Sequence, residues 1–138
     1  MKKNFESLVV GNSDSFFKKF NLDELNKFSE ISGDINPLHI SKKFAVNMGF
    51  KGNVLHGLLT SSLYSTLVGV YLVGDYALIH SVQIIFSQPA YLDLSYKTTG
   101  KIVHINKTQK QFEIHAKITD PEDLIISKAK IYCGYTNE

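Results

Sequence analysis

Arginine and tryptophan are absent from this chain of 138 residues, so all 15 of its basic side chains are lysines. Arginine is the usual bidentate reader of guanine edges and phosphate groups, whereas lysine supplies a flexible point charge. The net charge is only +2, and no run of lysines along the chain is longer than two. A nucleic-acid-binding protein is therefore not expected.

Cysteine and long apolar runs are also scarce. The one cysteine, Cys133, allows no disulfide within the chain and no CxxC pattern, and its apolar neighbours predict a buried thiol. Residues 1–7 are basic but lack the apolar core of a signal peptide. No apolar run reaches the roughly 18 residues that a membrane-spanning helix needs. We therefore expect a cytoplasmic protein without membrane contact.

The length fits one domain, because domains usually hold about 100–200 residues. A chain near this size can bury roughly 70% of the surface that it exposes when unfolded, so it needs no disulfide or metal to hold a core. No repeat, low-complexity tract or flexible linker divides the sequence. Residues 1–138 are expected to form a single domain.

The first half of the chain predicts helices and loops. Residues 5–20 fit a first strand with a turn at Gly11-Asn12-Ser13-Asp14. Asn21 with Glu24 three residues later is a capping-box signal, and the helix that it starts is expected to end at Gly33. Asn36 followed by Pro37 repeats the start signal and predicts a short helix over 37–46, with His39 in its first turn.

Residues 56–72 carry no charged side chain and have apolar or small residues on every face. A helix without a polar face is a buried helix. This segment is therefore expected to be the central helix of the core.

From residue 78 onward the apolar pattern has a period of two. In 112–119, apolar residues alternate with polar ones, which predicts a half-buried antiparallel strand, and further strands are expected at 79–88, 92–105 and 124–135. The fold class is α+β, with an antiparallel sheet of about five strands around one buried helix. Such a sheet leaves an exposed edge, and pairing of two copies through that edge would cover it.

Asp34 and His39 form the strongest candidate for catalysis. They lie five residues apart across the bend that Gly33, Asn36 and Pro37 create. A carboxylate and an imidazole brought together can polarise one water, the carboxylate accepting one proton while the imidazole relays another. The alternative is structural: Asp34 caps backbone N–H groups at a helix start and His39 is a surface residue.

Gly57 opens the predicted central helix. Backbone N–H groups at a helix start lack intrahelical partners and lie at the positive end of the dipole, so they can stabilise a developing oxyanion. Glycine there would let a ligand approach the backbone. The alternative is that Gly57 only permits the turn into the helix.

Together these segments resemble a known family. Residues 28–39 read FSEISGDINPLH, with Ala45 six residues later, and residues 54–58 read VLHGL before a serine-rich apolar helix. The first stretch closely resembles the hydratase motif of the MaoC-like (R)-specific enoyl-CoA hydratases and 3-hydroxyacyl dehydratases, and the second resembles that family's next landmark. The resemblance covers about residues 20–135 and implies a hot-dog fold, in which a sheet wraps a central helix.

The resemblance also implies an activity. Asp34 and His39 would hold the water that adds across the double bond of a 2-enoyl thioester, or that leaves an (R)-3-hydroxyacyl thioester in reverse. Gly57 N–H would bind the thioester carbonyl oxygen. The resemblance further implies substrate-binding roles for Asn36, which supports the loop, for His56, and for Ser65, which aligns with a site-lining serine. No cofactor is required, and the histidine spacing includes no HxH or HExxH metal pattern.

The chain departs from the family at three features. Ser41 stands where an Asp often follows the catalytic His, and Leu92-Asp93 stands where a Gly-Asp pair is common. The third is the missing arginine, since only lysines such as Lys42, Lys43 and Lys51 could meet the phosphates of coenzyme A. A carrier-protein thioester, with a single phosphate, is at least as suitable a substrate.

Two other functions stay open. A hot-dog thioesterase would need a carboxylate poised to attack or to activate water at the carbonyl carbon, and the intact motif at Asp34 and His39 argues against it. A non-catalytic subunit that binds acyl thioesters would not need both residues. The expected state is a homodimer with an acyl-CoA or acyl-carrier-protein substrate.

Overall fold

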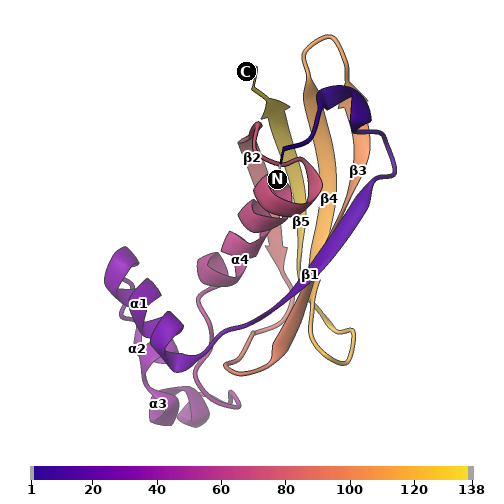
Figure 1. The fold of residues 1–138 in the computed structure, drawn as a ribbon. Coiled ribbons are helices and arrows are strands. Elements are labelled where there is room, and N and C mark those ends of the chain that lie inside the picture. The colour runs from indigo at the N-terminus through magenta and orange to yellow at the C-terminus, as the bar shows by residue number, and fades with distance from the viewer. Residues whose placement is uncertain (1, 137–138) are drawn as a thin grey trace.

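A five-stranded antiparallel sheet wraps around the central helix in the computed structural model, which describes residues 2–136 (Figure 1). The strand order is β1-β3-β4-β5-β2, so β1 and β2 form the two edges. This arrangement confirms the predicted α+β class and the hot-dog layout. The strands are β1 (Ser13–Lys19), β2 (Ala77–Phe86), β3 (Ser95–Asn106), β4 (Gln111–Thr119) and β5 (Ile125–Tyr135).

The inner face of the sheet supplies half of the core. On β4, the alternating residues Phe112, Ile114 and Ile118 are buried, and Ile114 pairs directly with Ile131 of β5. Alternation with period two puts these side chains on one face, as the sequence predicted. Cys133 of β5 is buried on the same side, and burial raises the pKa of its thiol to about 12.

Helix α1 (Leu22–Ser32) begins and ends where its signals predicted. Asn21 accepts from the Glu24 N–H at 2.8 Å while the Glu24 carboxylate accepts from the Asn21 N–H at 3.1 Å, a complete capping box. Gly33 ends the helix with φ of 76°, in the left-handed region that favours glycine.

The single helix predicted over 37–46 is wrong, because the chain forms two short helices there. Helix α2 (Pro37–Ile40) ends at Ser41, whose φ of −119° and ψ of 106° are extended, and α3 (Lys42–Asn47) follows. The Ser41 hydroxyl accepts from the Phe44 N–H at 3.2 Å and so caps α3. A second cap inside the apolar pattern breaks the helix.

The central helix consists of α4 (Gly57–Thr66) and a π-helical extension, η2 (Leu67–Leu72). Its sheet side is fully buried, and η2 approaches the sheet so closely that a Cβ on Gly100 would lie 2.4 Å from Leu67 Cδ2. The sequence predicted a helix that is buried on every face. In the single chain this is wrong, because Leu58, Ser62 and Ser65 are exposed. Among residues 2–136, no helix is long and apolar enough to cross a membrane.

The N-terminal segment closes the far end of the core. A 3₁₀ turn, η1 (Phe5–Ser7), precedes β1, and Phe5 packs against the rings of Phe112 and Tyr135 at centroid distances of 5.6 Å. The Lys3 ammonium donates to the carbonyl groups of Tyr71 and Leu72 at 2.7 and 3.0 Å, where η2 ends. A cation at a helix C-terminus satisfies unpaired carbonyls and matches the dipole. The first strand predicted within residues 5–20 is confirmed over Ser13–Lys19, whereas Ser13 and Asp14, which were expected in a turn, belong to the strand.

A buried hydrogen bond ties α4 to β5, and its removal should destabilise the fold. The Tyr64 hydroxyl lies 2.7 Å from Ser127 Oγ, both side chains are buried, and burial raises the Tyr64 pKa to about 12. Tyr64→Phe should lower the free energy of unfolding by about 1–3 kcal/mol, because it leaves the buried Ser127 hydroxyl without its partner. In denaturant unfolding, Ser127→Ala should then lower the free energy of unfolding less in the Tyr64→Phe variant than in the wild type. Additive costs would contradict a direct bond.

Candidate active site

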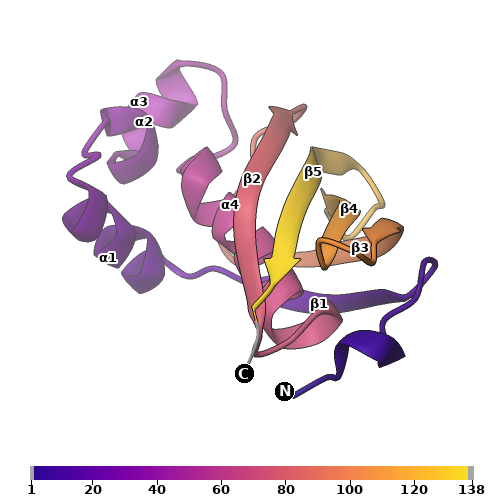
Figure 2. The same cartoon turned by 90° about the horizontal axis from the view of Figure 1, so that it is seen from above.

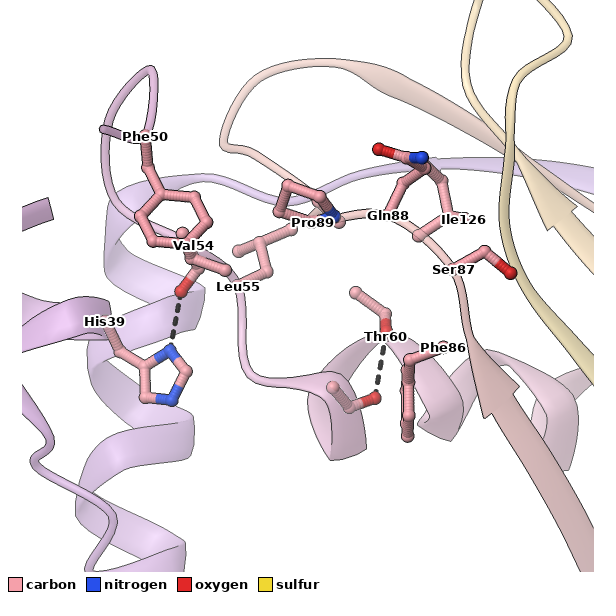
Figure 3. Close-up of a pocket in the computed structure, with 12 residues that line it drawn as sticks. His39, Phe50, Val54, Leu55, Thr60, Phe86, Ser87, Gln88, Pro89 and Ile126 are labelled. Atoms are coloured by element: carbon pink, nitrogen blue, oxygen red, sulfur yellow. Dashed lines mark hydrogen bonds between the residues drawn. The ribbon is translucent and has the colours of Figure 1, made fainter. Parts of the chain in front are cut away.

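A cavity of about 370 Å³ opens where α2 and the start of α4 meet the chain that leaves β2 (Figure 3). This volume is at the small end of the range for ligand sites, about 300–1,000 Å³. Its walls are apolar except at a few points. They include His39 on one side, Thr60 and Phe86 on the other, and Phe50 at the rim. Gly57 also lines the cavity.

The loop after α1 places Asp34 beside this cavity. The Ser32 hydroxyl accepts from the Asp34 N–H at 3.1 Å, and Asp34 Oδ1 accepts from the Asn36 N–H at 3.2 Å. Asn36 Oδ1 in turn accepts from the Leu38 N–H at 2.9 Å, so its side chain caps α2. Asn36 thus shapes the loop, while the second oxygen of Asp34 stays available.

His39 has its tautomer fixed by a backbone carbonyl. Its Nδ1 lies 2.6 Å from the Val54 carbonyl oxygen, and a carbonyl only accepts, so Nδ1 carries the proton (Figure 3). In the neutral form of the ring, Nε2 is then a bare acceptor, and it lies 3.6 Å from Asp34 Oδ2. The His39 side chain is 13% exposed and that of Asp34 is 49% exposed. A gap of this length suits a bridging water better than a direct hydrogen bond.

His56 lies behind His39 and is only 2% exposed. The two imidazole rings stack with centroids 3.9 Å apart, and His56 Nε2 lies 3.1 Å from both Ser29 Oγ and the Asp34 carbonyl oxygen. Burial lowers the pKa of His56, and the nearby charge of His39 acts in the same direction. His56 does not line the cavity, so the structure places it one layer behind the expected substrate position.

Asp34, His39 and His56 are close enough to be considered as metal ligands, with candidate atoms within 4.8 Å of one another. Lone pairs of imidazole nitrogens lie in the ring planes, and the two rings stack at an interplanar angle of 24°. Their lone pairs therefore do not converge on one ion. His39 Nδ1 and His56 Nε2 are already engaged by carbonyl groups, so the geometry suits a hydrogen-bonded network.

Gly57 is the first residue of α4, and its N–H donates to no acceptor within residues 2–136. Unpaired N–H groups at a helix N-terminus attract negative charge. A Cβ on this residue would lie 2.8 Å from the Phe86 ring, so the ring of β2 rests directly on the glycine. The cavity that His39 lines therefore also has a residue with an unpaired backbone donor.

The structure brings together Asp34, His39 and Gly57 as the sequence predicted. It leaves Ser65 on the exposed side of α4, away from the cavity. The sequence reasoning missed Phe86 and the Val54 carbonyl. A backbone carbonyl carries no side-chain signal, whereas Phe86 could have been suspected from its position at the end of a predicted strand.

Comparison with known sequences identifies related proteins. Residues 15–122 match the MaoC-like domain. The (R)-specific enoyl-CoA hydratase of Aeromonas caviae is 33% identical over 87 residues, which cover 63% of this chain and 65% of the relative. The 3-hydroxybutyryl-CoA dehydratase of Methylorubrum extorquens is 36% identical over 85 residues, covering 62% and 54%. The match thus spans less than two thirds of each relative's length.

Solved structures show the same fold. The (R)-hydratase from Aeromonas caviae involved in PHA biosynthesis superposes with a TM-score of 0.91 at 23% identity, covering 94% of this chain and 98% of that one. An R-hydratase from Pseudomonas aeruginosa gives a TM-score of 0.90 at 19% identity, covering 97% and 86%. The hot-dog fold is thereby confirmed, and since the family match extends over most of the sequence, this chain belongs to the MaoC-like domain family.

Proposed function

We propose that this protein is a hydro-lyase that adds water to 2-enoyl thioesters or removes it from (R)-3-hydroxyacyl thioesters. One observation carries the proposal: His39 places Nε2 beside the Asp34 carboxylate, at an apolar cavity that Gly57, with its unpaired N–H, also lines. The named activities of the Aeromonas and Methylorubrum relatives, a hydratase and a dehydratase, support the same reaction.

The proposed catalytic water lies between Asp34 Oδ2 and His39 Nε2. The Val54 carbonyl holds the imidazole proton on Nδ1, so Nε2 is ready to take a proton from the water. As the water oxygen bonds to C3 of the enoyl group, the double-bond electrons move toward the thioester carbonyl and form an enolate. The proton held on His39 then passes to C2. The elements of one water are added, and His39 returns to its neutral form.

Gly57 N–H is the proposed oxyanion donor in this step. Negative charge grows on the thioester oxygen as the enolate forms, and the start of α4 supplies both a donor and the positive end of a helix dipole. The chemistry requires no cofactor, because the thioester carbonyl is the electron sink. Asn36 is proposed to act through the loop and not by direct contact with the substrate, since its side chain caps α2.

Hydration of crotonyl-CoA tests the assignment. The wild type should consume the conjugated enoyl thioester, seen as a loss of its absorbance. Asp34→Asn and His39→Ala should each lower kcat by about 10²–10⁴-fold, because each removes a group that acts on the water. His115→Ala is the matched control, since His115 lies on the solvent side of the sheet and should leave kcat unchanged.

The same assay separates the rival functions. A thioesterase would release a free thiol, which a thiol reagent detects, without forming a 3-hydroxyacyl product. A binding subunit would retain intact enoyl-CoA, which mass spectrometry of the bound ligand would show. Wild-type rates in both the Asp34 and the His39 variants would overturn the proposed roles.

We also propose a homodimer, because one chain leaves the central helix half covered. Leu58 is 70% exposed on α4, and Ser62 and Ser65 lie on the same face at helical spacing. The edge strand β2 also exposes large apolar side chains, among them Val82, Ile85 and Phe86. A second copy packed along α4 and β2 would bury both surfaces and would place Ser65 inside the interface.

Charge at the proposed interface should separate the two copies. We expect the wild type to have twice the mass of one chain in sedimentation analysis at micromolar concentration. Leu58→Lys with Ile85→Lys should shift it toward the monomer, because two unpaired charges would have to be buried in each copy's contact surface. Phe17→Lys is the control, since Phe17 is exposed on β1 at the opposite edge. A monomeric wild type would refute the dimer.

Lysines beside the site are proposed to receive a phosphate of the thioester carrier. Lys42 and Lys51 line a surface hollow of about 360 Å³, and Asn53 in the same hollow donates to the His39 carbonyl at 2.8 Å. Lys43 does not line this hollow. Both coenzyme A and phosphopantetheine on a carrier protein present such a phosphate.

The cytoplasmic location expected from the sequence stays a prediction.

Charge reversal tests this subsite. Lys42→Glu with Lys51→Glu should raise the KM for crotonyl-CoA about tenfold with little change in kcat, because two weak charge contacts become repulsive. The increase should shrink as salt is added. Lys43→Glu is the matched control and should leave KM near the wild-type value. If Lys43→Glu raised KM as much as the double variant does, the effect would come from the overall charge of the protein and not from a local phosphate site.

A further inference from the structure

We propose that His56 is a positioning residue that holds both members of the catalytic pair in register, Asp34 through its backbone and His39 through its ring. The inference rests on the proposed function of Asp34 and His39 and assigns to their buried neighbour a part in it. His56 is within contact distance of both yet does not line the cavity.

The tether to Asp34 fixes the position of a loop. A carbonyl oxygen only accepts, so the 3.1 Å contact between His56 Nε2 and the Asp34 carbonyl requires a proton on Nε2. Asp34's other hydrogen bonds join it to Ser32 and Asn36, which are two residues away and exposed. The bond from His56 crosses 22 positions of sequence and comes from a buried side chain. It therefore anchors the catalytic loop to the start of α4.

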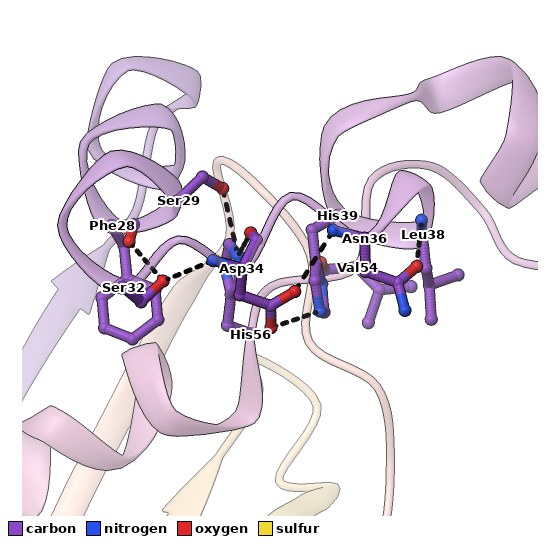
Figure 4. A network of polar contacts seen from close by, with 9 residues as sticks. All are labelled: Phe28, Ser29, Ser32, Asp34, Asn36, Leu38, His39, Val54 and His56. Atoms are coloured by element: carbon purple, nitrogen blue, oxygen red, sulfur yellow. Dashed lines mark hydrogen bonds and ion pairs between the residues drawn. The ribbon is translucent and has the colours of Figure 1, made fainter.

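The ring contact fixes the plane of His39. The His39 ring stacks on one face of His56 at 3.9 Å, and the ring of Phe28 from α1 meets His56 edge-on at 4.8 Å (Figure 4). The Val54 carbonyl holds one nitrogen of His39, and the stacked ring holds its plane. The lone pair on Nε2 lies in that plane, so both contacts are needed to aim it at the water. A misplacement of about 1 Å in such a pair can cost 10²-fold in rate.

His56 suits this place because its ring stays neutral. With Nε2 protonated, a second proton would go to Nδ1, which is buried and has no partner within residues 2–136. Burial and the charge of His39 both lower the pKa of His56, while the carbonyl and the carboxylate of Asp34 act in the opposite direction. A neutral ring adds no positive charge beside His39, and so it does not oppose the uptake of a proton there.

Two substitutions separate the two contacts. His56→Gln can still donate an N–H toward the Asp34 carbonyl but has no ring, and His56→Phe keeps the ring but has no N–H. We expect kcat on crotonyl-CoA to fall about 10–100-fold in each, with a much smaller change in KM. Ser29→Ala, which removes only the second partner of His56 Nε2, should have little effect. His115→Gln and His115→Phe are matched controls on the solvent face.

The pH profile distinguishes positioning from acid–base catalysis. If His56 only positions, kcat/KM of His56→Phe should fall by the same factor at every pH, with the acid limb of the profile unmoved. In the His39→Ala background, the same substitution should cost little more, because the group through which it acts is gone. Loss of the acid limb from the pH profile of His56→Phe would overturn the proposal. So would a double variant in which His56→Phe lowers kcat/KM as much as it does in the wild type.

Nitrogen-15 NMR of labelled histidine tests the geometry without reference to activity. The wild type should show His56 as the neutral Nε2–H tautomer at neutral pH, and its ring should keep that form to lower pH than histidine in a short peptide, because burial lowers its pKa. His39 should show its proton on Nδ1, and this signal should weaken in His56→Gln. Protonation of His56 at the same pH as the peptide histidine would refute the proposal even if neither variant folds. An inactive wild type with the expected spectra would instead refute the proposed function and leave the positioning intact.

Discussion

The central helix has apolar or small residues on every side, and a single sheet can cover only part of it. That constraint explains much of the architecture. The sheet curls around α4 (Figure 2). Glycine is needed at position 100 of β3, because a Cβ there would lie 2.4 Å from Leu67 Cδ2. The same helix begins at Gly57, so the element that fills the core also brings unpaired N–H groups to the edge of the cavity. Core burial and the candidate oxyanion site are thus two consequences of one segment.

The catalytic pair depends on a second constraint, the path of the chain into α4. Val54, His56 and Gly57 lie within four residues, and each meets a different part of the site: a carbonyl for His39, a buried ring for the loop, and a backbone N–H at the cavity. Asp34 and His39 come from a separate stretch, the loop after α1 and helix α2. Because the two stretches meet only in the folded chain, a loss of packing between α1 and α4 would affect geometry and chemistry together.

The sequence predicted most of the fold because its signals are local. Capping residues at Asn21 and Gly33 fixed both ends of α1, and strict alternation identified β4. The break at Ser41 was missed because a serine within an apolar pattern is compatible with both a helix and a cap. The exposed face of α4 was missed for another reason. A pattern shows that a face is apolar or small, but not whether its own chain or a second copy covers it.

The sequence predicted only the side chains of the site, not the backbone groups that orient them. Asp34, His39 and Gly57 were proposed as catalytic residues from residue types and a family resemblance, and their roles stay a prediction. His56 was expected to bind substrate from the resemblance alone, whereas the structure buries it outside the residues that line the cavity. The Val54 carbonyl could not be predicted at all, since every residue has one. What sets the tautomer of His39 is thus invisible at the level of sequence.

The charge pattern shows the same limit of sequence reasoning. No long lysine run exists, yet the sheet brings lysines together from different strands: Lys117 pairs with Lys128, and His115 lies between Lys101 and Lys130. Like charges directly opposite each other across a sheet are unfavourable, so they are tolerated only where water screens them, on the outer face. The cavity contains no lysine among its lining residues. In the proposed reaction the His39 imidazole acts as a base, and this arrangement keeps lysine side chains out of the cavity that it lines. The helix dipole at Gly57 would then stabilise the developing negative charge without a charged side chain.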